Sequence, residues 1–116
     1  GAEKLTTDGI GFVTFDPSKT GLYVGLGCYY VGASVPVKID ALSYFGTFLK
    51  SGTAFDAAHI VGSHPTLADL TDADLSNWGT AVHEIIDKTP GSTFATFAET
   101  ASTPPSPYIV ARGLSP

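Results

Sequence analysis

The sequence predicts an α+β domain in which a small, mostly antiparallel β-sheet of five to six strands packs on one α-helix, at about residues 71–88. Segments rich in Val, Ile, Phe and Tyr occur in both halves of the chain, and several alternate with small or polar residues, which is typical of strands. Only one stretch carries apolar residues at helical spacing. The expected order is β-β-β-β-α-β-β, with the helix covering the sheet.

Four strands are expected before the helix. Residues 9–15 are short and rich in Ile, Val and Phe, and a turn with Pro17 and Gly21 follows them. Residues 22–31 alternate between the two faces of a strand. Residues 35–41 alternate as well, with Pro36 at an edge or bulge.

This last strand is expected to run on through residues 42–45 to a turn at residues 50–52. It then resumes at residues 53–55. Residues 59–70 contain Gly62 and Pro65 and have mixed polarity, so they are expected to form a loop.

The helix prediction rests on capping residues and on an apolar stripe. Thr71 is a good N-cap, and Asp72 and Asp74 fall in the first turn, where carboxylates complement the helix macrodipole. Pro90 and Gly91 end the pattern. The stripe consists of Leu75, Trp78, Val82, Ile85 and Ile86. Two more strands are expected at residues 93–98 and 108–111, separated by the proline-rich residues 102–107.

Length and charge limit the functions that the chain can serve. Its 116 residues fit one domain, residues 1–116, of which Gly1 and Ala2 are expected to be a cloning remnant. Six basic and eleven acidic residues give a net charge of −5, which argues against binding of nucleic acid or an anionic membrane surface. No apolar run approaches the roughly 20 residues of a membrane-spanning helix. No signal peptide is expected, and the compartment stays open.

Reactive side chains are few. A single cysteine, Cys28, excludes an internal disulfide framework, and its apolar neighbours favour an inert core thiol. His59 and His64 have Asp56 and Asp69 nearby, but the spacing matches no zinc signature, so no metal is expected. Ser63 lacks the context of a nucleophile elbow. Asp69, Asp72 and Asp74 lack the calcium-loop pattern. No cofactor is expected.

Trp78 is the most informative side chain of the predicted helix. A large aromatic residue on an apolar stripe is most simply explained as core. It can also form the floor of an apolar cleft if one end of the helix is left uncovered.

One stretch resembles a known family. Residues 44–58, Tyr-Phe-Gly-Thr-Phe-Leu-Lys-Ser-Gly-Thr-Ala-Phe-Asp-Ala-Ala, are similar to the strand–turn–strand of FK506-binding-type peptidyl-prolyl isomerases, the FKBP family. That family commonly shows Tyr-x-Gly-x-Leu-x-x-Gly-x-x-Phe-Asp-x-Ser. Trp78 follows Phe55 at the family's spacing for its helix tryptophan, and Pro104-Pro105 before Tyr108 resembles the family's end. The spacing from Tyr44 to Phe55 is one residue longer than in the family, and no tyrosine occurs between Phe97 and Pro107.

The resemblance implies an FKBP-like proline-binding domain that catalyses peptidyl-prolyl cis/trans isomerisation. It implies that Tyr44, Phe55 and Trp78 form the walls and floor of an apolar cleft, with Leu75 as a further wall and Asp56 as a polar partner. The barrier to rotation about a peptide bond is about 18–20 kcal/mol, and a dry apolar pocket favours the less dipolar, twisted amide. Such a reaction needs no cofactor.

The alternative function is that of a non-enzymatic binding or assembly module, such as a decoration, adhesion or interaction domain. Aromatic residues in the predicted strands, among them Tyr23, Tyr29 and Tyr30, favour it. Such a module acts through an exposed apolar or aromatic surface. The expected partners are a protein or proline-containing peptide, or further copies in a homo-oligomer or larger assembly.

Overall fold

The computed structural model describes residues 2–13, 15, 36–54, 57–78, 83–88 and 94–113. The strand predicted at residues 22–31 and the cysteine at position 28 lie outside these residues. The elements in chain order are α1 (Ala2–Val13), β1 (Val37–Lys38), the 3-10 helix η1 (Asp40–Phe45), β2 (Leu49–Ala54), β3 (Ala58–Ile60), the 3-10 helix η2 (Pro65–Leu67), α3 (Asp72–Leu75), β4 (His83–Lys88), β5 (Ala95–Thr100) and β6 (Pro107–Ala111).

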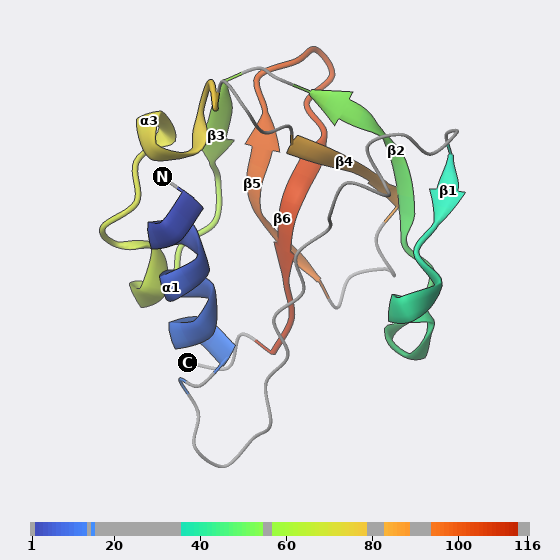
Figure 1. The fold of residues 1–116 in the computed structure, drawn as a ribbon, viewed down its shortest axis with the longest axis horizontal. Helices are drawn as coiled ribbons and strands as arrows, with labels where there is room; N and C mark the ends of the chain where they lie inside the picture. The colour runs from blue at the N-terminus through green and yellow to red at the C-terminus, as the bar shows by residue number, and fades with distance from the viewer. Residues whose placement is uncertain are drawn as a thin grey trace.

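The described strands form two antiparallel sheets of three strands each, in the orders β1-β2-β4 and β3-β5-β6. β4 also lies beside β6, so the two sheets meet along these strands. Figure 1 shows β5 and β6 in the centre, with β1 and β2 on one side and α1, α3 and β3 on the other. The predicted α+β class with antiparallel strands is therefore confirmed, but the strands are divided between two sheets.

The predicted helix at residues 71–88 is confirmed only at its first turn: residues 83–88 form the strand β4, and residues 79–82 lie outside the described residues. The Thr71 N-cap is confirmed, because the Asp74 carboxylate accepts hydrogen bonds from the Thr71 N–H at 2.9 Å and from its hydroxyl at 2.7 Å. α3 ends at Leu75, since the Ser76 hydroxyl donates to the Asp72 carbonyl at 2.6 Å and Asn77 adopts a positive φ of 55°.

Residues 83–88 form a strand. Their apolar pattern alone would fit a strand or a helix. Ile85 and Ile86 are β-branched, which favours strands. Glu84 and Ile86 are both buried and lie on one face, as the two-residue period of a strand requires. The pairing of β4 with β2 decides between the two periods.

The strand predicted at residues 9–15 is also wrong, because α1 extends from Ala2 to Val13. The segment before residue 9 contains good helix formers, and the helix continues through Gly9 and Gly11. Leu5 packs against the core beside α3. Phe12 follows it by seven residues and therefore lies on the same helix face.

The central segment differs from its prediction in two places. Residues 42–45 belong to η1 and not to a strand. β2 runs through the predicted turn at residues 50–52. The register of its pairing with β4 shifts between Leu49 and Gly52, as at a β-bulge. The strand at residues 35–41 is confirmed only as β1, and the loop at residues 59–70 begins with the last residues of β3. β5 and β6 confirm the two predicted C-terminal strands.

Two apolar clusters form the described core. The first contains Ala58, Leu70, Leu75 and Ala98, and it lies between α3, β3 and β5. The second contains Ile39, Phe48 and Ile86, and Val110 of β6 packs against it. No helix within the described residues combines the length and the apolar character that crossing a bilayer requires.

Candidate functional site

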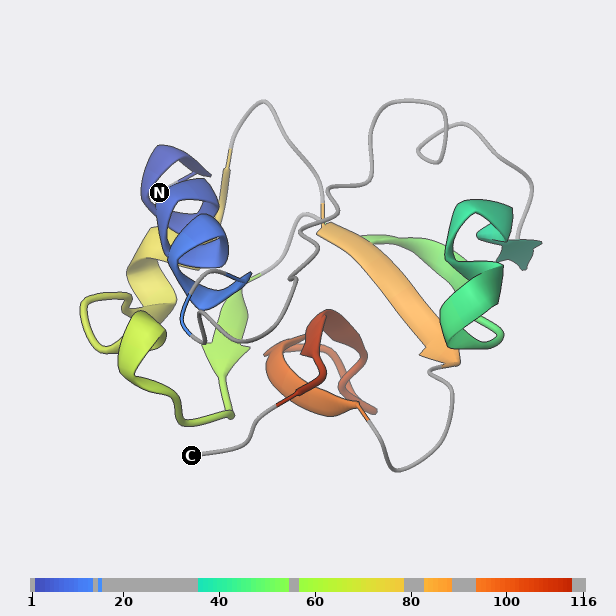
Figure 2. The same cartoon turned by 90° about the horizontal axis from the view of Figure 1, so that it is seen from below.

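Of the five residues predicted to form a proline-binding cleft, Leu75 and Trp78 lie together in the described part of the chain. Leu75 is 1% exposed, and Trp78 is partly buried against the same core cluster. The Trp78 indole N–H donates to the Asp74 carbonyl at 2.8 Å. Tyr44 belongs to η1, and Figure 2 shows η1 and α3 on opposite sides of β5 and β6. Phe55 and Asp56 lie outside the described residues. The cleft therefore stays a prediction.

His59 and Asp72 form a pair on the surface beside α3. His59 Nδ1 lies 3.0 Å from Asp72 Oδ2, and the Ile60 N–H donates to Asp72 Oδ1 at 2.8 Å. These hydrogen bonds, the one from His59 above all, lower the pKa of the Asp72 carboxyl. His59 thus lies on β3 and has a fixed partner, whereas the sequence predicts a solvated loop residue.

A histidine oriented by a carboxylate can serve as a general base if a nucleophile lies beside it. In the described part of the chain no serine or threonine hydroxyl forms a hydrogen bond with His59. Ser76 bonds instead to the backbone, accepting from the Ala58 N–H at 2.8 Å and donating to the Asp72 carbonyl. The His59–Asp72 pair therefore joins β3 to α3. Among the described side chains, no three potential ligands converge to hold a metal ion.

Four aromatic side chains from three separate segments pack on one another. We call Phe12, Phe15, His64 and Phe97 the aromatic cluster. The His64 ring meets Phe12 and Phe15 edge-on, with centroids 4.9 and 5.2 Å away, and stacks on Phe97 at 6.1 Å. Phe12 also meets Phe97 edge-on at 5.8 Å. The end of α1 and the loop after β3 are thereby attached to β5.

The loop that carries His64 lies unusually close to β5. The backbone N–H groups of Val61 and Gly62 both donate to the Phe97 carbonyl, at 2.9 and 3.1 Å. A Cβ atom at Gly62 would lie 2.5 Å from Phe97 Cδ1 and 2.9 Å from Phe97 Cα. Only glycine permits this approach, so Gly62 places His64 over Phe97.

The α1 region and the loop after β3 expose the large apolar side chains of the described surface. These are Ile10 and Phe15 in or beside α1 and Val61 in the loop after β3, which are 52%, 53% and 50% exposed. The loop after β3 also lines a hollow of about 370 Å³. Its lining is mostly apolar or small: Ile60, Gly62, Ser63, His64, Pro65, Leu67 and Ala68.

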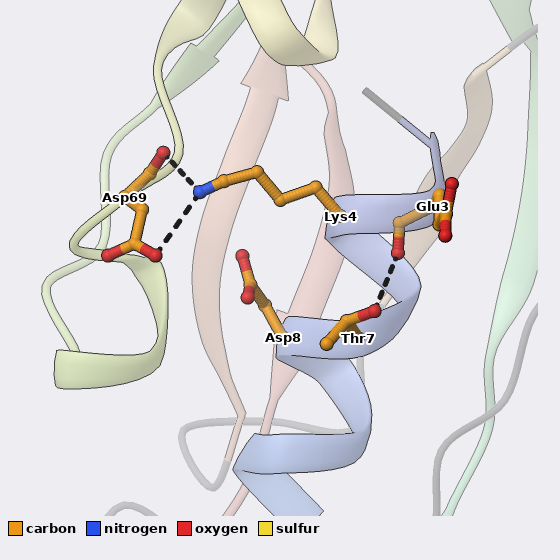
Figure 3. A pocket seen from close by; sticks show the side chains of 5 residues that line it. All are labelled: Glu3, Lys4, Thr7, Asp8 and Asp69. Carbon is orange, nitrogen blue, oxygen red and sulfur yellow. Dashed lines mark hydrogen bonds and ion pairs between the residues drawn. The ribbon is translucent and has the colours of Figure 1, made fainter.

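A second hollow, of about 430 Å³, lies at the start of α1 and is polar (Figure 3). The Lys4 ammonium donates to the Asp69 carbonyl and lies 3.4 Å from the Asp69 carboxylate. Thr7 donates within the helix to the Glu3 carbonyl. The Lys4–Asp69 contact attaches α1 to the segment before α3, and because Asp69 is exposed the ion pair contributes little stability.

The sequence interpretation missed the aromatic cluster. Phe12 and Phe15 fall in the strand predicted at residues 9–15, although their spacing of three residues also fits one face of a helix. The interpretation treated His64 as a solvated loop residue because no neighbour in the sequence indicates its contact with Phe97. Comparison of the chain with family models, with curated proteins and with solved structures finds no match.

Proposed function

We propose that the chain is a non-enzymatic assembly module that binds a second copy of itself through the aromatic cluster and the apolar side chains beside it. One observation carries this proposal: Ile10, Phe15 and Val61, the exposed large apolar side chains of the described surface, come from α1, the residues just after it and the loop after β3, which supply two of the three segments of the cluster. Apolar surface gathered in this way is typical of interaction sites. Closed homo-oligomers are the commonest soluble assemblies, which favours a second copy as the partner.

The expected affinity follows from the area available. Full burial of a Phe, Ile or Val side chain contributes about 1.5–3 kcal/mol, so each half-exposed side chain contributes on the order of 1 kcal/mol. Association costs several kcal/mol of translational and rotational freedom. We therefore expect weak association, with a Kd on the order of 1 mM. The net charge of −5 on each copy opposes association, and salt screens this repulsion.

Light scattering over a concentration series tests the proposal. The wild-type mass should rise with concentration, and added salt should strengthen the rise. Phe15→Lys should keep the mass constant, because it places a charge in the apolar contact. Thr47→Lys adds the same charge at an exposed site after η1 and should behave as the wild type does. A wild-type chain that stays monomeric to about 1 mM, or a Phe15→Lys variant that associates normally, contradicts the proposal.

Proline-peptide binding with cis/trans isomerisation is the second candidate. The partly buried Trp78, packed on the same core cluster as the buried Leu75, supports it, because this is the arrangement expected for a cleft floor. The test combines an isomerisation assay with the NMR signal of the Trp78 indole during titration with a proline-containing peptide. We expect a rate above background and a shifted indole signal. An unchanged rate and an unchanged signal exclude this candidate.

A further inference from the structure

Two ionisable side chains of opposite charge are buried between the sheets. Lys50 on β2 is 1% exposed, and Glu84 on β4 is 8% exposed. In the antiparallel pairing Lys50 lies opposite Ile86, so Glu84 is the diagonal neighbour on the same face of the sheet. Long side chains reach across such a diagonal. The Lys50 Nζ atom lies 3.6 Å from Glu84 Oε2.

The Glu84 carboxylate is poorly satisfied for a buried group. Neither of its oxygens accepts a hydrogen bond from the described residues. The 3.6 Å contact with Lys50 is too long for a hydrogen bond, so it is an ion pair alone. Burial raises the pKa of the Glu84 carboxyl, and the Lys50 ammonium offsets part of that rise. A buried pair of this kind gains little from its charges, because desolvation opposes their attraction.

We propose that Lys50 and Glu84 condense into an amide cross-link that joins β2 to β4. A proton first passes from the Lys50 ammonium to the Glu84 carboxylate, which leaves a neutral amine beside a neutral acid. The amine lone pair then attacks the carboxyl carbon of Glu84 and forms the N–C bond. The C–O bond breaks, and the oxygen leaves with two protons as one water molecule. The reaction needs no oxidant, cofactor or co-reactant.

The surroundings of the pair favour each step. Burial favours the neutral form of the Glu84 carboxyl, and a neutral amine is the nucleophile that the attack requires. Two packed strands hold the reacting groups together, so the reaction is intramolecular, and the 3.6 Å separation of Lys50 Nζ and Glu84 Oε2 places the nitrogen beside the carboxyl group that it would attack. The product amide carries no charge, and it removes the poorly satisfied carboxylate from the core.

Intact mass spectrometry under denaturing conditions tests the cross-link, because an ion pair does not survive unfolding but an amide bond does. The folded wild-type chain, incubated at neutral pH, should be lighter than calculated by one water molecule. Trypsin should fail to cleave after Lys50, and residues 39–88 should remain one peptide that carries the same loss. A full calculated mass with cleavage after Lys50 overturns the proposal and leaves a simple ion pair.

Three variants assign the loss to this pair. Lys50→Arg and Glu84→Gln should each lose no water. Glu99→Gln, a matched change on β5, should keep the wild-type loss. Loss of water in Lys50→Arg would place the reaction elsewhere and overturn the proposal. If the first two variants do not fold, the tryptic fragments of the wild-type chain decide alone. None of these results depends on self-association.

Discussion

His64 stacks on Phe97 with ring centroids 6.1 Å apart and planes inclined by 29°, although one residue lies in a loop and the other in the middle of β5. Phe12 touches both rings edge-on. Phe97 is buried, so it is the base on which the more exposed rings rest. The proposed contact surface therefore depends on a core residue that a partner would not touch.

Phe97→Ala should lower the free energy of unfolding by about 3–5 kcal/mol, because it removes a buried ring and leaves a cavity beneath His64 and Phe12. Phe15→Ala should cost about 1 kcal/mol or less, since that ring is half exposed. Denaturant titration of both variants measures the difference. Equal losses would mean that Phe97 does not support the cluster.

Gly62→Ala should destabilise the chain by about 1–3 kcal/mol, because the new methyl group meets the Phe97 side chain and backbone. Gly52→Ala is the matched control. Its nearest neighbour would be Ile85 Cδ1 at 3.9 Å, an ordinary contact, so alanine should be neutral or slightly stabilising there. In thermal melts, Gly62→Ala should lower the Tm and Gly52→Ala should leave it unchanged or raise it slightly, and a neutral Gly62→Ala would refute the close approach.

Lys50→Met should destabilise the fold by at least about 3–5 kcal/mol, because the buried Glu84 loses its ion-pair partner and can no longer be cross-linked. Without Lys50, Glu84 has its raised pKa in the folded chain and must fold in its neutral form. The penalty therefore grows as the pH rises above the unfolded-state pKa of a glutamate. Replacing Glu84 with leucine in the same chain should recover much of the loss at neutral pH. Denaturant midpoints at pH 5 and 7 measure both effects, and a Lys50→Met chain that is as stable as the wild type contradicts the burial of the pair.

The cap of α3 should make stability fall in acid. Hydrogen bonds from Thr71 lower the pKa of the Asp74 carboxyl in the folded chain. A carboxyl with a lowered folded-state pKa contributes stability above its unfolded pKa, and that contribution is lost as the pH falls through the folded value. Asp74→Asn should therefore show a smaller loss of Tm below about pH 4 than the wild type. Ala73→Asn changes the same helix but keeps the carboxylate, so it should retain the full dependence.

The sequence predicted the parts of the fold that depend on neighbouring residues. The apolar, aromatic and β-branched residues at 93–98 and 108–111 predict strands, which β5 and β6 confirm, and the spacing of Thr71 and Asp74 identifies the cap. Residues 83–88 were misassigned because two isoleucines in a row fit either period, and only the pairing with β2 decides between them. The glycines and phenylalanines at the end of α1 are weak helix formers, so the sequence did not indicate this helix. Packing on η2 and α3 stabilises it.

The candidate site was beyond local reasoning. Each residue of the aromatic cluster has an ordinary neighbourhood in the sequence, and the site exists only because Gly62 lets a loop approach β5. The buried Lys50 is a similar case. A lysine within a strand normally predicts an exposed face, and its burial follows from the position of Glu84 on the adjacent strand.

The two sheets are interleaved along the chain. One takes β1, β2 and β4, and the other takes β3, β5 and β6, so neither is built from a continuous segment. A break between β3 and β4 would separate β2 from its partner β4 and β3 from its partner β5 at the same time. Neither fragment would then hold a complete sheet. We therefore expect the domain to unfold cooperatively, with Trp78 fluorescence and the backbone signal of the strands changing together in one transition.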